Sequence, residues 1–146
     1  MFNKILAPLD ATGPNEKILQ SVLAVINQPK VQITLISVIK NKFAAAYPYV
    51  SRSLPEAAMQ EMKSSTNKLL DDAAETLHQA ANESVEINTI IKEGDPADQI
   101  LRYAKDHAID VIVIGSRGLD GVKGLMLGSV SHKVSQLSDC PVLIVH

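Results

Sequence analysis

The sequence has few of the residues that stabilise secreted or metal-binding proteins. Among its 146 residues Cys140 is the single cysteine, so no disulfide can form within the chain, and no cysteine–histidine cluster has metal-ligand spacing. No apolar run approaches the ~20 residues that cross a bilayer, and the first residues lack the pattern of a signal peptide. These absences predict a cytoplasmic protein with neither a structural metal site nor a membrane partner.

An excess of one charge is also missing. The net charge is −2, and acidic and basic residues are interspersed along the chain. The sequence therefore does not indicate the basic patch that binds nucleic acid. Any affinity for phosphate must therefore be local. The hydrophobic fraction of 46% is typical of a globular protein, and the length suits one domain over residues 1–146.

Residues 115–129 stand out because they place five glycines between an apolar strand, residues 111–114, and a helix with Val130 and Val134 on one face. Glycine permits positive φ and close approach to the backbone, while the first turn of a helix presents unpaired N–H groups and a positive dipole end. Together these features suit a phosphate. The alternative is a flexible connection, since the spacing matches neither the P-loop nor the dinucleotide fingerprint.

Apolar patterns alternate between the two regular periods along the whole chain. They predict strands at residues 5–9, 31–39, 85–91, 111–114 and 141–145, and helices over residues 14–27, 53–80, 96–107 and 129–137. Asp95 and Pro96 supply a helix cap and first position, and the stripe from Met59 to Ala80 predicts a buried helix face. Strict alternation predicts an α/β fold, an open, doubly wound five-stranded parallel sheet with helices on both faces.

The glycine spacing resembles the ATP-binding signature of the universal stress protein family, G-x2-G-x9-G-(S/T). Gly115, Gly118, Gly128 and Ser129 occupy its positions, and the flanking apolar segments are similar from Ile5 to the last strand. The resemblance implies the strand order 3-2-1-4-5, which reverses between the first and fourth strands. Ligands of such sheets bind at the carboxyl ends of the strands beside that reversal.

The resemblance also implies a site for an adenine nucleotide, ATP with Mg²⁺ held mainly through its phosphates. Its residues are Val38 at the adenine edge, Pro8 and Asp10 beside the adenosine, Ile114 and Gly115 at the ribose, and Gly118, Gly128, Ser129, Val130 and Ser131 around the phosphates, with Arg117 in reach of a phosphate.

Several of these residues have a simpler structural interpretation. Asp10 follows a strand, where aspartate often closes an Asx turn or caps a helix. Arg117 is equally well explained as solvated surface charge, and Ser131 as an exposed helix serine. After Asp10, many family members continue with Gly-Ser, whereas this chain has Ala11-Thr12-Gly13-Pro14. This departure puts contacts from the first loop in doubt more than nucleotide binding.

The resemblance favours an ATP-binding stress-response protein that acts as a nucleotide-dependent switch or binding module. A slow ATPase or phosphotransferase is the alternative enzyme, although no acid or base is committed to phosphoryl transfer. A nucleotide-free dimeric scaffold is the third interpretation. The last strand, residues 141–145, is hydrophobic and would lie at a sheet edge, so we expect a homodimer through it.

Overall fold

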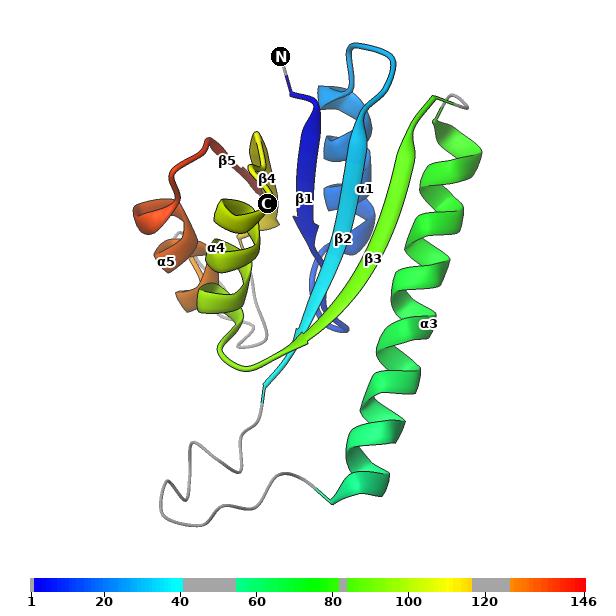
Figure 1. Ribbon diagram of the computed structural model, residues 1–146, viewed down its shortest axis with the longest axis vertical. Coiled ribbons are helices and arrows are strands. Elements are labelled where there is room, and N and C mark those ends of the chain that lie inside the picture. The colour runs from blue at the N-terminus through cyan, green and yellow to red at the C-terminus, as the bar shows by residue number, and fades with distance from the viewer. Residues whose placement is uncertain (1, 41–54, 82–83, 117–126) are drawn as a thin grey trace.

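The computed structural model describes residues 2–40, 55–81, 84–116 and 127–146. Strands and helices alternate along them (Figure 1). Their order is β1 (Lys4–Pro8), α1 (Asn15–Val25), β2 (Gln32–Ile39), α3 (Glu56–Ala80), β3 (Glu86–Glu93), α4 (Pro96–Asp106), β4 (Val111–Gly115), α5 (Ser129–Leu137) and β5 (Val142–Val145). The predicted elements are confirmed, with bounds that differ by a few residues.

The five strands form one parallel sheet in the order β3-β2-β1-β4-β5, which confirms the expected topology. Ile5 of β1 lies opposite Ile33 of β2 on one side and Val111 of β4 on the other. From β1 the chain proceeds to β2 and β3 in one direction, and later to β4 and β5 in the other. The carboxyl ends of β1 and β4 therefore border the point of reversal.

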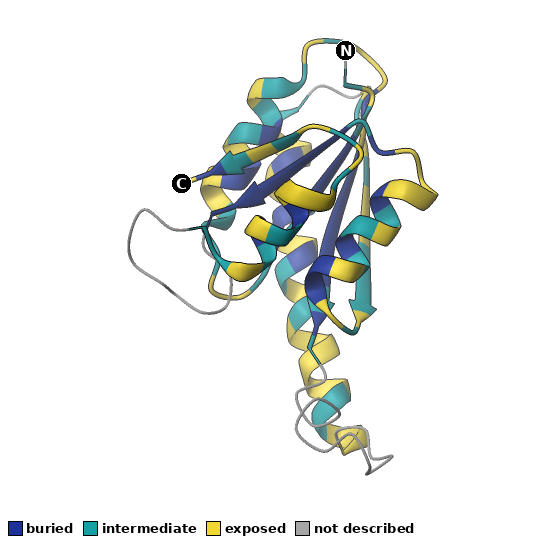
Figure 2. Ribbon diagram, turned by 90° about the vertical axis from the view of Figure 1, so that its left-hand side faces the viewer, coloured by how far each residue is buried: buried dark blue, intermediate teal, exposed yellow. Residues whose placement is uncertain are grey.

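Each face of the sheet has its own hydrophobic core, because successive strand residues point to opposite faces. Ile5, Ala7 and Val113 are buried against α1 and α3, whereas Leu6 and Ile112 are buried against α4 and α5. The interiors of the three central strands, β2, β1 and β4, are consequently buried on both faces (Figure 2). Such burial explains why these strands are mainly apolar, and it stabilises the fold by about 1.5–3 kcal/mol for each large side chain.

Asp95 and Pro96 begin α4 as the sequence predicts. The Asp95 carboxylate accepts a 3.0 Å hydrogen bond from the backbone N–H of Asp98, and Pro96 occupies the first turn, where its missing N–H costs nothing. The helix ends at His107, whose Nδ1 lies 3.1 Å from the Tyr103 carbonyl oxygen. His107 thus contacts one of the last carbonyl groups of the helix. These local contacts define the two ends of α4.

The prediction for the first half of α3 is wrong. Leu70 and Leu77 are buried, but Met62 is 39% exposed and Met59 is only half-buried. A helix of 25 residues is about 37 Å long, whereas the eight residues of β3 span about 26 Å. The first turns of α3 therefore continue past the sheet (Figure 1). None of the helices in the described residues is long and apolar enough to cross a membrane.

Candidate functional site

A pocket of about 550 Å³, its open mouth included, lies at the carboxyl ends of β1, β2 and β4. It is therefore at the reversal of strand order, where ligands bind in open α/β sheets. Its lining comes from three strand ends and from the starts of α1, α4 and α5, and consists of Pro8, Leu9, Asp10, Gly13, Pro14, Asn15, Ile18, Ile36, Val38, Pro96, Ile100, Ile114, Gly115, Val130 and Ser131.

Most of the site residues named from the sequence come together here. The lining includes seven of them: Pro8, Asp10, Val38, Ile114, Gly115, Val130 and Ser131. Gly128 and Ser129 directly precede Val130, as the cap and first residue of α5. Arg117 and Gly118 lie outside the described residues. The end of β1, the end of β4 and the start of α5 therefore border one pocket.

Asp10 closes a turn and lines the pocket at the same time. Its Oδ1 accepts hydrogen bonds from the Thr12 backbone N–H at 2.8 Å and from the Thr12 hydroxyl at 3.0 Å. This is the Asx turn that the sequence offered as the simpler interpretation. Neither bond uses Oδ2. The turn orients the carboxylate at the end of β1, so the structural and the ligand interpretations are compatible.

Gly115 is required by packing as well as by its place in the pocket. A Cβ at this position would lie 2.9 Å from both Cγ and Cδ of Pro14 and 3.4 Å from Cδ1 of Ile18. Real Cβ atoms essentially never approach a carbon so closely, so the start of α1 can pack on the end of β4 only where a side chain is missing. This contact between Pro14 and Gly115 was invisible in the sequence, because the two residues are far apart along the chain.

Gly128 does not need the conformational freedom of glycine. Its φ of −61° and ψ of 159° are open to any residue, and it caps α5 without a side-chain hydrogen bond. Its backbone N–H donates to the Ser116 carbonyl at 2.8 Å. What remains for glycine at this position is the absence of a side chain, which adds no bulk beside the first N–H groups of α5, the groups that bind anions at helix starts.

Ser131 is buried, contrary to the expectation of an exposed helix serine. It is 1% exposed, and its hydroxyl lies 3.2 Å from the Ser116 carbonyl oxygen and 3.1 Å from that of Gly128. Because the hydroxyl has one hydrogen, the two carbonyls share it. Ser131 therefore joins the start of α5 to the end of β4, and this side-chain donor is already in use.

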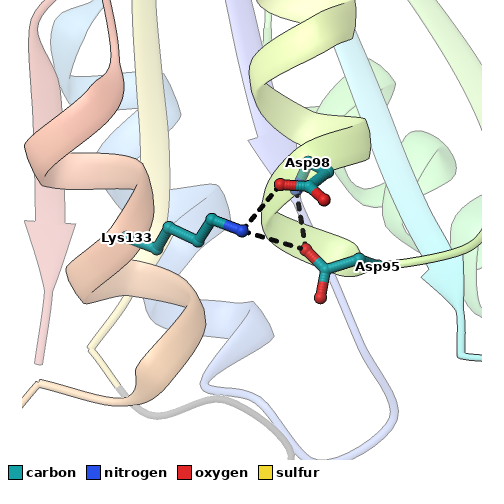
Figure 3. A network of polar contacts seen from close by, with 3 residues as sticks. All are labelled: Asp95, Asp98 and Lys133. Atoms are coloured by element: carbon teal, nitrogen blue, oxygen red, sulfur yellow. Dashed lines mark hydrogen bonds and ion pairs between the residues drawn. The ribbon is translucent and has the colours of Figure 1, made fainter. Parts of the chain in front are cut away.

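An ion-pair cluster connects the two helices that border the pocket on one face of the sheet (Figure 3). Lys133 Nζ of α5 lies 2.7 Å from Oδ1 of Asp98 and 3.7 Å from Oδ2 of Asp95, both at the start of α4. The hydrogen bond to Asp98 raises the pKa of Lys133 above its ordinary value of 10.5. The partners are about half exposed, so solvent screens their attraction.

The described lining is mainly apolar, and Asp10 is its single charged residue. Such a surface suits a planar base and a sugar better than a triphosphate, which fits only where the pocket opens onto the start of α5. Within the described residues, no group of three or more acidic, histidine or cysteine side chains is placed to hold a metal ion. Sequence reasoning did not place Gly13, Pro14 and Asn15 at this site.

Known proteins resemble this chain in sequence and in fold. The model of the universal stress protein family matches residues 1–146. Universal stress protein YxiE of Bacillus subtilis is 37% identical, over 99% of this chain and 99% of its own. The solved structure of MJ0577, of Methanocaldococcus jannaschii, is 26% identical over 99% of this chain and 96% of that one, with a TM-score of 0.83. A universal stress protein family protein of Arabidopsis thaliana, At3g01520, solved with AMP bound, is 24% identical over 98% and 90%, with a TM-score of 0.64.

Proposed function

Because the chain belongs to the universal stress protein family, we propose that it binds an adenine nucleotide in the pocket at the carboxyl ends of β1, β2 and β4. We further propose that it works in the cytoplasm as a nucleotide-dependent switch or binding module. The observation that carries the proposal is one pocket that combines apolar strand ends with the open N-terminus of α5. AMP on the same fold in the Arabidopsis protein supports it.

The chemistry of the lining orients the nucleotide. Ile36 and Val38, at the end of β2, give an apolar contact for the adenine. Ser129 and Val130, at the start of α5, would turn their N–H groups to the phosphates, where the helix dipole adds to the attraction. The sugar then lies between these ends, beside Asp10. An opposite orientation would place phosphates against an apolar strand end and is disfavoured by desolvation.

ATP with Mg²⁺ is the form of ligand that the glycine spacing favours. The residues at the site fit a metal ion that the phosphates hold, because Asp10 is the single carboxylate in the described lining. A bound Mg²⁺ would neutralise phosphate charge, which the described lining does not do with a cation of its own. The chain's own contribution is the amide-rich start of α5.

Calorimetric titration with AMP, ADP and ATP, with and without Mg²⁺, tests the proposal, and GTP is the control for the base. We expect saturable binding of adenine nucleotides and weaker binding of GTP, whose exocyclic groups differ at the adenine edge. Mass spectrometry of nucleotide released from the purified protein provides an independent check. The proposal fails if no adenine nucleotide binds and none is released.

We also propose that copies of the chain pair through β5, which lies at one edge of the sheet. Leu143 is 38% exposed there, and edge strands leave backbone N–H and C=O groups free to pair. A two-fold, antiparallel contact of β5 with its copy would cover both the leucine and the free edge.

A further inference from the structure

The Asn15 side chain contains an unpaired buried oxygen beside the pocket. In the described part of the chain, its Oδ1 is the one buried side-chain nitrogen or oxygen atom without a hydrogen-bond partner. Buried polar atoms are nearly always paired, because leaving one unpaired costs about 1–3 kcal/mol. Bulk water does not satisfy this oxygen, since almost none of its surface is exposed. The cost calls for a functional explanation.

The hydrogen bond of the amide nitrogen, Nδ2, fixes the orientation of the Asn15 amide. Nδ2 donates a 2.7 Å hydrogen bond to the backbone carbonyl oxygen of Asp10. Exchanging the two amide atoms would bring oxygen against oxygen, so Oδ1 must point away from this carbonyl. The asparagine thus clamps the turn after β1 and holds a spare acceptor in one direction.

Gly13 lies beside both that acceptor and the Asp10 carboxylate. A Cβ on Gly13 would lie 3.3 Å from Oδ1 of Asn15 and 3.3 Å from Oδ1 of Asp10. Gly13 does not have a positive φ, so a side chain is not excluded there by backbone conformation. Two acceptor oxygens, one of them charged, therefore lie close to the same position beside Gly13, where even a Cβ would be crowded. A hydrogen-bond donor without negative charge is the complementary group.

The position of these two oxygens indicates which part of a nucleotide would meet them. Across the pocket, the end of β2 with Val38 lies on one side of β1, and β4 with the start of α5 lies on the other. Asp10 and Asn15 follow β1, in the middle. With the adenine at β2 and the phosphates at α5, the middle part is the sugar, whose hydroxyls are neutral donors.

We propose that Asn15 is a specificity-determining residue whose Oδ1 accepts a hydrogen bond from a sugar hydroxyl of the bound nucleotide. The inference rests on the proposed nucleotide site and makes it selective for ribose. The proposal requires the Gly13–Pro14 turn to shift outward so that the hydroxyl reaches the shielded oxygen. This turn is half-buried and belongs to neither a helix nor a strand.

The test is calorimetric titration of the parent protein and Asn15→Leu with AMP, 2′-deoxy-AMP and 3′-deoxy-AMP. Asn67→Leu, at an exposed position of α3, is the matched control. We expect the parent and the control to prefer AMP to at least one deoxy analogue by about three- to tenfold, the effect of one hydrogen bond. Asn15→Leu should bind all three ligands alike. A structural role alone would weaken all three ligands equally and leave the preference unchanged.

Gly13→Ala is a second variant that retains both oxygens and places a methyl group 3.3 Å from each of them, where it would hinder a sugar hydroxyl. It should lower the preference for AMP while circular dichroism shows a folded protein. AMP binding without any preference in the parent, or a preference unchanged in folded Asn15→Leu or Gly13→Ala, would overturn the inference and leave the nucleotide site standing. Absence of AMP binding in the parent would instead overturn both proposals.

Discussion

At the scale of single residues, several side chains at the pocket serve the fold and the proposed ligand together. One carboxylate oxygen of Asp10 accepts the hydrogen bonds of the turn that orients the side chain. The Ser131 hydroxyl already donates to backbone carbonyls that join α5 to β4. Phosphate contacts at the start of α5 would therefore come from backbone amides. Loss of a single hydroxyl here should therefore affect folding more than nucleotide affinity.

Gly128→Val should weaken nucleotide binding by steric obstruction at the start of α5. Its φ of −61° is open to valine, so the variant should fold. Gly94→Ala is the matched control: its φ of +131° strains a side chain, and it should lose about 1–3 kcal/mol of stability with unchanged affinity. Titration with ATP and thermal unfolding check both variants. Unchanged affinity in folded Gly128→Val would contradict the proposed phosphate end.

Gly115→Ala should destabilise the protein by about 1–3 kcal/mol, a typical cost of overpacking. The added Cβ would lie 2.9 Å from two carbons of Pro14. Pro14→Ala removes those carbons, so Gly115→Ala should cost much less in that background. Urea unfolding of the parent, both single variants and the double variant measures this coupling. Equal costs in the two backgrounds would show that the Pro14 contact is not the cause.

At the scale of elements, α4 and α5 both contribute residues to the pocket, and Lys133, Asp95 and Asp98 join the two helices. Asp95 also caps α4, so a substitution there would change the helix and the ion pair together. Asp98 and Lys133 make the shorter contact, 2.7 Å. The link between the two helices depends on charge and is therefore open to a test by pH and salt.

Lys133→Met should remove a contribution to stability that is present at neutral pH and lost in alkali. The hydrogen bond to Asp98 raises the pKa of Lys133 in the folded state above 10.5, so folding favours the protonated amine. The contribution is complete below about pH 10.5 and declines as the pH rises through the folded-state pKa. The difference in Tm between the parent and Lys133→Met, measured from pH 8 to 12, should fall at the alkaline end.

Added salt should reduce the same difference at pH 8, because the groups are exposed. Lys68→Met, on the exposed face of α3, is the control for losing one positive charge. A difference in Tm that grows with pH, or one that Lys68→Met reproduces, would contradict this assignment.

At the scale of the whole molecule, the two edges of the sheet differ. β3 presents charged and polar residues, among them Glu86, Asn88 and Lys92, whereas β5 presents the half-buried and exposed apolar side chains of Val142, Leu143 and Ile144. Charged side chains protect an edge from pairing, and apolar ones do not. The asymmetry favours association through β5 alone.

Leu143→Glu should convert a dimer into a monomer at micromolar concentration, because it places charge in the proposed contact between copies of β5. Leu137→Glu is the matched control, since Leu137 is 60% exposed on α5 and outside the strand. Sedimentation velocity measures the outcome. A parent that is monomeric, or a Leu143→Glu variant that stays dimeric, would contradict the pairing.

Sequence was sufficient for the order and type of the elements, because buried parallel strands require apolar runs and amphipathic helices require a 3.6-residue period. The carboxyl-edge position of Pro8, Asp10, Val38 and Gly115 also followed, once alternation and family resemblance implied the topology. Asp95 could be predicted as a cap because capping is a local interaction.

Tertiary structure alone decided the contacts between segments far apart in the chain. Met62 has an apolar side chain at a helical period, but only the lengths of α3 and β3 reveal that no strand lies beneath it. Gly115 meets Pro14, and Ser131 meets Ser116, through the packing of elements that no local pattern encodes. The unpaired oxygen of Asn15 belongs to the same class, because whether a polar atom has a partner depends on everything that surrounds it.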